Sequence, residues 1–329
     1  MTQVHSKKDI FFIRSDRLGE FLLSLPAIKL VKENHPDSNI YLLARKENID
    51  LIRNVDFVDY FIEYKEDYFR GLRGAFHLAK IFRRENIGCV IVLNPKKEFH
   101  FASLLARIRC RVGYDRKWGF CLNRTIEDKK FLADKHEVEY NLDLVSLICR
   151  NVFVPRIDIP TPQIKELTFL KNHLNMDKKC IALHPFSSHS LKKIPSGFWL
   201  ELTQRIKSVL TQTQLVIIGA EEDRQEGLAL QKLLEIRNIT GRLSLSNLAT
   251  FLRSCTSLLI GLDSGPMHLA SMLKVPVVGL FSASNMRRWG PYDTDSLVIQ
   301  AESERGFVDK IDEIISFIRR FLPPPNHTS

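Results

Sequence analysis

The chain has 329 residues, of which 44% are hydrophobic and 26% charged, proportions typical of a globular protein and not of a disordered one. Its formal net charge of +10 favours anionic partners, but the excess of Lys and Arg is spread over both halves, which argues against a nucleic-acid-binding tail. Six cysteines stand far apart without a C-x-x-C pair, which indicates reduced thiols in a cytosolic protein and neither a disulfide framework nor a zinc site.

The chain begins with a predicted β-α-β unit. Ile10 to Ile13 is a buried strand, Phe21 to Asn34 a partly buried helix, and Ile40 to Ala44 a second strand. Charges from Arg14 onward interrupt the first apolar run too early for a signal peptide or a membrane span, so we expect a protein that is not exported. The absence of a G-x-G-x-x-G motif argues against a nicotinamide dehydrogenase.

The rest of the first half continues as alternating strands and helices. We predict strands at Val58 to Tyr64, Cys89 to Leu93 and Arg111 to Tyr114, and helices at Phe69 to Glu85 and Phe99 to Ala106. In the helix Phe69 to Glu85, the apolar residues Leu72, Phe76, Leu78, Ala79 and Phe82 predict a single buried face.

A basic cluster lies between two of these elements. It comprises Arg107, Arg109, Arg111, Arg116 and Lys117, opposed only by Asp115. Such clusters are often solvated faces, but an acceptor that carries phosphates or sugar acids would use the same residues. Both interpretations remain open at this point.

Three prolines, Pro155, Pro160 and Pro162, mark a linker, and we place the domain boundary between residues 158 and 159. The second half repeats the alternation, ending in a helix that could pack back on the first domain. Its predicted strands are Cys180 to Leu183, Leu215 to Ile218, Ser257 to Ile260 and Val275 to Phe281, and its helices are Lys165 to Leu174, Arg224 to Leu234, Ser246 to Ser254, Pro266 to Leu273 and Val308 to Phe321. The pattern predicts an α/β protein with two doubly wound domains.

Polar loops follow several predicted strands of the second half, where open α/β sheets bind ligands. Ser187, Ser188 and Lys192 can offer hydroxyls and a cation to a diphosphate. Glu222 can accept hydrogen bonds from ribose hydroxyls, although acids at a helix start also complement its dipole. Asp263, Ser264 and Gly265 precede a helix whose free N–H groups suit a phosphate.

The segment DSGPMHLASMLKVPVVGLF, residues 263–281, followed by RRWGPY, residues 287–292, resembles the signature of glycosyltransferase family 9, the ADP-heptose:lipopolysaccharide heptosyltransferases. The loop at residues 14–20 resembles the amino-terminal motif R-x-D-x-x-G-(D/E) of the same family. The alternative for the first segment is that Asp263 and Ser264 only cap a helix and that His268 is a satisfied core histidine.

The resemblance implies the GT-B fold, in which two Rossmann-like domains face one another across a cleft. It implies an inverting transfer that needs no metal and no cofactor, with a nucleotide sugar such as ADP-heptose as donor and the lipopolysaccharide core, or a similar anionic glycolipid, as acceptor. The first domain would bind the acceptor through Asp16 and the basic cluster, and the second would bind the donor. Donor binding would involve Ser187, Ser188, Lys192, Glu222, Asp263, Ser264, Gly265 and His268.

The family's catalytic base is an Asp that follows the glycine of the amino-terminal motif, and this chain has Glu20 there. Glu20 keeps the carboxylate but could also be only a favourable acid in a first helical turn. Lys192 would meet the charge of the leaving group. The family helix near residue 140 includes His136, which could face an acceptor or simply cap that helix.

Other functions stay open on the sequence. Asp293 and Asp295 form a D-x-D pattern that binds metal in another glycosyltransferase architecture, but three residues match easily by chance. The protein could use another sugar donor, could bind without catalysis, or could hydrolyse or epimerise nucleotide sugars. We expect a cytoplasmic protein with possible peripheral contact with the inner membrane, because such acceptors are amphiphilic.

Overall fold

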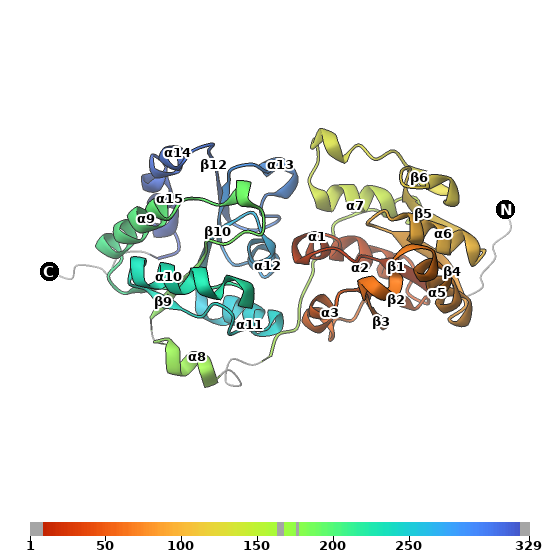
Figure 1. Cartoon of the computed structure of the whole chain (residues 1–329), viewed down its shortest axis with the longest axis horizontal. Helices are drawn as coiled ribbons and strands as arrows, with labels where there is room; N and C mark the ends of the chain where they lie inside the picture. The colour runs from red at the N-terminus through yellow and green to blue at the C-terminus, as the bar shows by residue number, and fades with distance from the viewer. Residues whose placement is uncertain (1–8, 163–167, 176–177, 323–329) are drawn as a thin grey trace. The chain divides into compact units, whose positions relative to one another are not determined.

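The computed structural model describes residues 9–162, 168–175 and 178–322. The chain folds as two compact units, residues 1–160 and 161–329 (Figure 1). The sequence-based boundary at 158/159 lies next to this division. The assignment of the acceptor to the first unit and the donor to the second stays a prediction.

Each unit contains a six-stranded sheet in which every paired strand is parallel to its neighbour. The strands of the first unit are β1 Asp9–Ile13, β2 Ile40–Ala44, β3 Tyr60–Glu63, β4 Ile87–Val92, β5 Cys110–Tyr114 and β6 Arg124–Ile126. Those of the second are β7 Lys179–His184, β8 Thr213–Ile217, β9 Arg237–Asn238, β10 Thr256–Leu262, β11 Val277–Phe281 and β12 Ser296–Gln300. The predicted doubly wound α/β class is confirmed.

The two sheets have the same strand order. It is β3-β2-β1-β4-β5-β6 in the first unit and β12-β11-β10-β7-β8-β9 in the second, which is the same order counted from the opposite edge. The direction of winding reverses between β1 and β4, and again between β7 and β10. Ligands bind at such switch points in doubly wound sheets, so the loops that follow these four strands are where a site is expected.

The helices of the first unit largely match the predicted ones. They are α1 Leu18–Leu22, α2 Leu25–Asn34, α3 Lys46–Ile52, α4 Glu66–Phe69, α5 Gly71–Arg84, α6 Lys97–Leu105 and α7 Glu137–Val145, with short 3-10 turns η1 Gly119–Cys121 and η2 Lys130–Leu132. The single helix predicted from Phe21 to Asn34 is wrong, because the chain breaks at Ser24. The Ser24 hydroxyl donates to the carbonyl of Phe21 at 2.6 Å, and Pro26 has no N–H to continue the ladder.

The predicted buried face of α5 is also wrong in part. Leu78, Ala79 and Phe82 are buried, but Leu72 is 62% exposed and Phe76 is 58% exposed. The apolar residues of α5 therefore cover more of its circumference than the sheet and α6 can bury.

The helices of the second unit are α8 Thr168–His173, α9 Ser196–Val209, α10 Arg224–Leu234, α11 Leu245–Cys255, α12 Gly265–Met272, α13 Met286–Trp289, α14 Glu304–Val308 and α15 Ile311–Arg319, with turns η4 Ser190–Lys192 and η5 Glu221–Asp223. The start of the predicted helix Lys165 to Leu174 lies outside the described residues. The predicted last helix, Val308 to Phe321, divides into α14 and α15. Ile314, Ile315 and Ile318 of α15 pack into the core of the second unit, and the expectation that this helix also packs back on the first domain stays a prediction.

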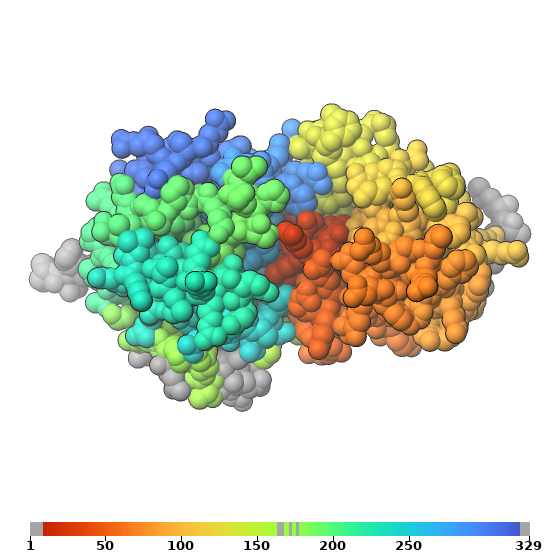
Figure 2. All heavy atoms as spheres, viewed as in Figure 1, coloured from red at the N-terminus to blue at the C-terminus, as the bar shows by residue number. Residues whose placement is uncertain are grey.

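Each unit has its own apolar core between sheet and helices. Phe11 and Val90 belong to the core of the first unit, and Trp199 and Ile260 to that of the second. In the space-filling view the first unit is coloured red through yellow and the second green through blue (Figure 2). Among the described residues, no helix combines the length and the apolar character that a membrane crossing requires.

Candidate functional site

The loops that follow β7, β10 and β11 converge at the carboxyl edge of the second sheet. Lys192, in η4 after β7, forms an ion pair with Asp263, which follows β10; Nζ and Oδ2 lie 2.5 Å apart. Ser282, after β11, donates to the carbonyl of Leu191 at 2.9 Å. Residues far apart in the sequence are thereby joined into one polar site at the switch point.

Asp263 is the centre of this site. Its side chain is buried, and its second oxygen, Oδ1, lies 3.5 Å from Nε2 of His268. Burial by itself raises the pKa of Asp263, but hydrogen bonds and opposite charge from His268 and Lys192 outweigh it and lower the pKa from 3.8 to about 2. The carboxylate is therefore ionised at neutral pH and fixes the position of the Lys192 ammonium. Asp263 does not act as a helix cap, which removes the capping-only alternative for this residue.

Ser264 is the residue before α12, but its side chain does not cap the helix either. Its hydroxyl donates to the carbonyl of Leu262 at 3.0 Å and lies 3.0 Å from Nδ1 of His184. Burial lowers the pKa of His184 to about 4, so this ring is neutral at pH 7. Gly261 pairs with His184 across the two strands, and a Cβ there would lie 3.2 Å from that of His184, so glycine permits the close approach.

The amino end of α12 faces this polar site with its first-turn N–H groups not bonded by the Ser264 side chain. Pro266 occupies the first turn, where its missing N–H costs nothing. His268 is buried, and its Nδ1 atom has no hydrogen-bond partner in the part of the chain that the structure describes. Together with the helix dipole and Lys192, these groups form an anion-binding arrangement.

The second cluster of the family signature packs beside this helix. The rings of His268 and Trp289 meet edge-on with centroids 6.5 Å apart, and the guanidinium of Arg288 lies 4.6 Å from the Trp289 ring. Ser271 of α12 donates to the carbonyl of Tyr292 and accepts from its N–H, both at 2.8 Å. These contacts explain why RRWGPY accompanies the residues 263–270 in the sequence: it supports α12 from the side.

The remaining predicted donor residues lie in neighbouring loops. Ser187 and Ser188 follow β7, and the Ser187 hydroxyl accepts from the N–H of His189 at 3.1 Å. Glu222 is exposed in η5 after β8, one strand further along the sheet. The neighbouring Lys193 instead forms an exposed ion pair with Glu226 at 2.7 Å. Lys192, which contacts Asp263, therefore stays the lysine that we predict for the donor site.

The first unit has a second polar site at its own switch point, built around Arg14. This side chain is 2% exposed, and its guanidinium donates to the carbonyl of Glu20 from Nη2 at 2.8 Å and from Nε at 3.1 Å, and to the carbonyl of Leu93 at 3.1 Å. It lies 3.3 Å from Asp16 Oδ2 and 3.7 Å from the buried carboxylate of Glu137. Arg14 thus ties the loop after β1 to the loop after β4 and to α7.

Asn94, after β4, completes this network. Its amide donates to the Ser15 hydroxyl at 2.8 Å and to Asp16 Oδ1 at 3.0 Å, and its carbonyl oxygen accepts from the Ser15 N–H at 3.2 Å. The predicted acceptor residue Asp16 is thereby held in place, with about a third of its side chain exposed.

Glu20 lies in α1, partly buried, with its backbone carbonyl fixed by Arg14. Within the described residues, no hydrogen bond or ion pair engages its carboxylate. The carboxylate is therefore available to accept a hydrogen bond from a ligand. His136, in contrast, is the N-cap of α7 and accepts from the N–H of Val138 at 3.2 Å, as the capping interpretation predicted.

The predicted basic cluster is not a single patch. Arg107 and Arg109 precede β5, whereas Arg116 and Lys117 follow it, so they lie at opposite ends of a strand that spans about 16 Å. The guanidinium of Arg111 donates to the carbonyls of Cys121 and Ile108 at 2.7 and 2.5 Å. The expectation that all five bind one acceptor together is therefore wrong, because neighbours in sequence are separated by the strand between them.

Sequence reasoning assigned no role to Arg14, Asn94, Glu137 or His184. The available signal was the position of Arg14, Asn94 and His184 at the end of a buried strand. Nothing in the local sequence pairs these residues with their partners, since Arg14 and Leu93 are 79 positions apart.

Asp293 and Asp295 do not form a metal site in the described part of the chain, where no group of His, Cys, Asp or Glu side chains is arranged to hold a metal ion. Asp293 pairs with Lys274, and Asp295 lies 3.7 Å from Arg320. All six cysteines are free thiols.

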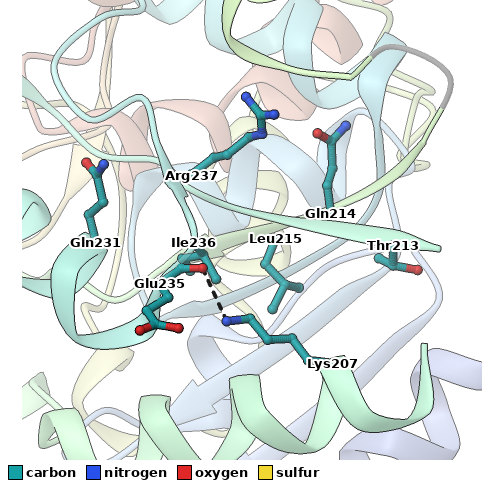
Figure 3. Close-up of a pocket in the computed structure, with 8 residues that line it drawn as sticks. All are labelled: Lys207, Thr213, Gln214, Leu215, Gln231, Glu235, Ile236 and Arg237. Carbon is teal, nitrogen blue, oxygen red and sulfur yellow. Dashed lines mark hydrogen bonds between the residues drawn. The ribbon is translucent and has the colours of Figure 1, made fainter. Parts of the chain in front are cut away.

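A hollow of about 450 Å³ lies away from the candidate site, at the amino ends of β8 and β9 (Figure 3). Its lysine, Lys207, donates to the carbonyls of Leu234 and Glu235 at the end of α10. Because the Lys207 ammonium satisfies carbonyls at the end of a helix, we assign Lys207 a structural role.

Several known proteins are similar to this chain in structure or in sequence. The structure resembles the crystal structure of a family 9 glycosyl transferase from Veillonella parvula (TM-score 0.82, 19% identity, 96% of this chain and 97% of that one). It also resembles the heptosyltransferase WaaC of Escherichia coli with ADP (TM-score 0.71, 16% identity, 95% and 99% covered). The lipopolysaccharide core heptosyltransferase OpsX of Haemophilus influenzae is 22% identical over 309 residues, 90% of this chain and 85% of that protein.

The fold defined by two parallel six-stranded sheets, and shared with these structures, is GT-B-like. Residues 76–310 match the model of glycosyltransferase family 9 (heptosyltransferase). The chain therefore belongs to glycosyltransferase family 9 and is a glycosyltransferase, as the sequence motifs predicted.

Proposed function

We propose that this glycosyltransferase moves a heptose, or a related sugar, from an ADP-sugar to the lipopolysaccharide core or a related anionic glycan. The observation that carries the proposal is the arrangement in the second unit, where Asp263 holds Lys192 beside the amino end of α12. A cation, a helix amino terminus and the buried His268 together suit the diphosphate of a nucleotide sugar. The fold similarity to WaaC, whose structure was determined with ADP, supports an adenine nucleotide.

The proposed reaction is a single displacement that inverts the anomeric carbon. Glu20 accepts the proton of the acceptor hydroxyl while the hydroxyl oxygen forms a bond to that carbon. The bond between the carbon and the β-phosphate oxygen breaks, and the nucleoside diphosphate leaves with the electron pair. Lys192 and the first-turn N–H groups of α12 stabilise the charge that develops on the phosphate.

The roles of the two acids differ because their surroundings differ. Asp263 pairs with the ammonium of Lys192 and contacts His268, so it positions the cation and does not take a proton. Glu20 has no such partner among the described residues. General-base assistance of this kind contributes about 10²–10⁴-fold to a rate. The proposal requires Glu20 to act on the acceptor that attacks the same donor whose phosphate Lys192 binds.

We propose that Asp16 binds the acceptor together with Arg116 and Lys117, the basic residues at the carboxyl edge of the first sheet. Arg116 also pairs with Asp128 at 2.8 Å, so an anionic acceptor would compete with that contact. We expect the protein to act in the cytoplasm at the inner face of the membrane, where amphiphilic acceptors are assembled.

A panel of ADP-, GDP- and UDP-sugars, each with and without lipopolysaccharide core acceptors, tests the proposal. We expect a product only with an ADP-sugar and an acceptor together. Product with another nucleotide would change the donor, and sugar conversion without an acceptor would indicate hydrolysis or epimerisation. Donor binding with no turnover under any condition would indicate a binding protein that has lost catalysis.

A further inference from the structure

The first unit exposes a connected set of apolar side chains that we call the aromatic surface. It is formed by α5, α6 and the loop that carries η1, which pack against one another (Figure 1). The rings of Phe76 and Phe101 lie 6.5 Å apart between centroids, those of Phe101 and Trp118 lie 6.0 Å apart, and those of Trp118 and Phe120 lie 6.0 Å apart. Leu72 and Leu104 extend it along the two helices, and Phe120 is 76% exposed.

These side chains are not displaced core residues. The buried face of α5 is already supplied by Ala75, Leu78, Ala79 and Phe82, and α6 buries Phe99 and Ala102. Phe101 and Leu104 stand at spacings of four and seven residues from Lys97, on one face of α6, and Leu72 and Phe76 are one turn apart on α5. Phe101 is partly buried and packs against the core of the first unit, whereas Leu72, Phe76, Trp118 and Phe120 are exposed and form a second apolar face around it.

The loop that presents Trp118 and Phe120 is held in an unfavourable backbone conformation. Lys117 and Trp118 have φ angles of 47° and 70°, which cost energy for residues with a Cβ. The buried His100 supports the loop, since its Nδ1 lies 3.0 Å from the carbonyl of Lys117 and must donate to it. Burial lowers the pKa of His100 to about 4, so the ring is neutral at pH 7. The strained loop thus exposes two aromatic side chains, those of Trp118 and Phe120, to solvent.

Positive charge surrounds the aromatic surface. The sequence of α5 contains Arg73, Lys80, Arg83 and Arg84 and no acid. Lys97 of α6 places its ammonium 5.8 Å from the centroid of the Trp118 ring. The further basic residues Arg116 and Lys117 stand in the loop before η1. The acids nearby are Glu98 and Asp115, together with Glu85 and Asp128, which pair with Arg84 and Arg116 at 2.6 and 2.8 Å.

We propose that the aromatic surface docks this protein on the anionic face of a phospholipid bilayer. Aromatic rings beside Lys and Arg characterise segments that lie in a membrane interface, where the rings enter the acyl boundary and the cations meet anionic headgroups. A contiguous exposed apolar patch marks an interaction site, and the basic surroundings favour lipid over an apolar protein partner. This inference does not depend on which sugar the enzyme transfers.

Sedimentation of the full-length protein with vesicles of phosphatidylcholine, with and without phosphatidylglycerol, tests the inference. We expect binding only to the vesicles that contain phosphatidylglycerol, and weaker binding as salt rises. The double variant Phe76→Ser/Phe120→Ser should bind at least about tenfold more weakly, because two large apolar side chains leave the interface. The matched control is Leu228→Ser/Leu233→Ser, which removes two exposed apolar residues from α10 of the second unit and should bind as the wild type does.

Tryptophan emission gives an independent readout. Trp118 is 38% exposed, Trp199 is buried, and Trp289 is partly exposed but belongs to the second unit, so vesicles should shift the emission to shorter wavelength through Trp118. Trp118→Phe should remove this shift while most binding is kept.

Several results would overturn the inference. Unchanged vesicle binding by Phe76→Ser/Phe120→Ser, equal binding to neutral vesicles, or no binding to either kind would each do so. Sedimentation velocity covers the second-copy alternative, since a wild-type dimer that dissociates in the double variant, without vesicle binding, would assign the surface to self-association. Circular dichroism establishes that the variants fold, and no sugar substrate enters these assays, so the result is independent of the transfer assay.

Discussion

The ion pair between Lys192 and Asp263 provides a quantitative test of the donor site. Asp263→Asn replaces the buried carboxylate with a neutral group of nearly the same shape, which resembles the protonated acid. The variant removes the charge that Lys192 and His268 stabilise, while Lys192, about a quarter exposed, can be solvated. We expect the second unit to lose stability at neutral pH.

The magnitude follows from the pKa of Asp263. A decrease from 3.8 to about 2 corresponds to about 2.5 kcal/mol of stabilisation by the ionised form, at about 1.36 kcal/mol per pH unit. Because the pKa is lower in the folded state than in the unfolded state, this stabilisation is complete well above pH 4 and is lost as the pH falls toward 2. About half of it should remain at pH 3.

Urea unfolding of both proteins between pH 7 and pH 3 measures the difference. It is followed by tryptophan emission in a Trp118→Phe background, where the signal comes from Trp199 and Trp289 of the second unit. Asp309→Asn is the control, because it breaks an exposed pair with Arg305, 3.0 Å apart, which should contribute less than about 1 kcal/mol. A difference between wild type and Asp263→Asn that stays the same from pH 7 to pH 3 would refute the reasoning. So would an equal loss in Asp309→Asn.

Three further predictions concern the reaction. Glu20→Gln should reduce transfer by at least about 10²-fold and leave nucleotide-sugar binding nearly unchanged, because it removes only the proton acceptor. The control Glu47→Gln, which changes another first-turn acid, should transfer sugar at the wild-type rate. Normal turnover in Glu20→Gln would exclude Glu20 from the mechanism. Lys192→Met should lower kcat by about 10²–10³-fold, because stabilisation of the leaving phosphate is lost. The control Lys193→Met breaks only the exposed pair with Glu226, so its kcat should stay within about twofold of wild type. Equal effects of the two variants would contradict the role of Lys192 in the donor site. EDTA should leave the initial rate unchanged, and strong inhibition that Mg²⁺ or Mn²⁺ reverses would bring Asp293 and Asp295 back into consideration.

The sequence by itself determined the class of fold and the location of the loops. Short continuous apolar runs that end in a polar loop, such as Cys89 to Leu93, predict strands buried on both faces, and the helical segments between them indicate parallel crossovers. The motif at residues 263–270 and the R-x-D-x-x-G-(D/E) loop identified the family, because their mixed chemistry rarely occurs by chance. These features are local, so the printed residues suffice to find them.

Tertiary structure alone decided which of these residues meet. Strand order places the end of β1 beside that of β4, and the end of β7 beside that of β10, which brings Arg14 to Leu93 and Lys192 to Asp263. Leu72 and Phe76 have the spacing of a buried helix face, yet they remain exposed, because the core of the first unit ends before it reaches them. Hydrophobic periodicity reports how apolar residues are arranged on an element, whereas their burial depends on the neighbours that the whole chain brings to that face.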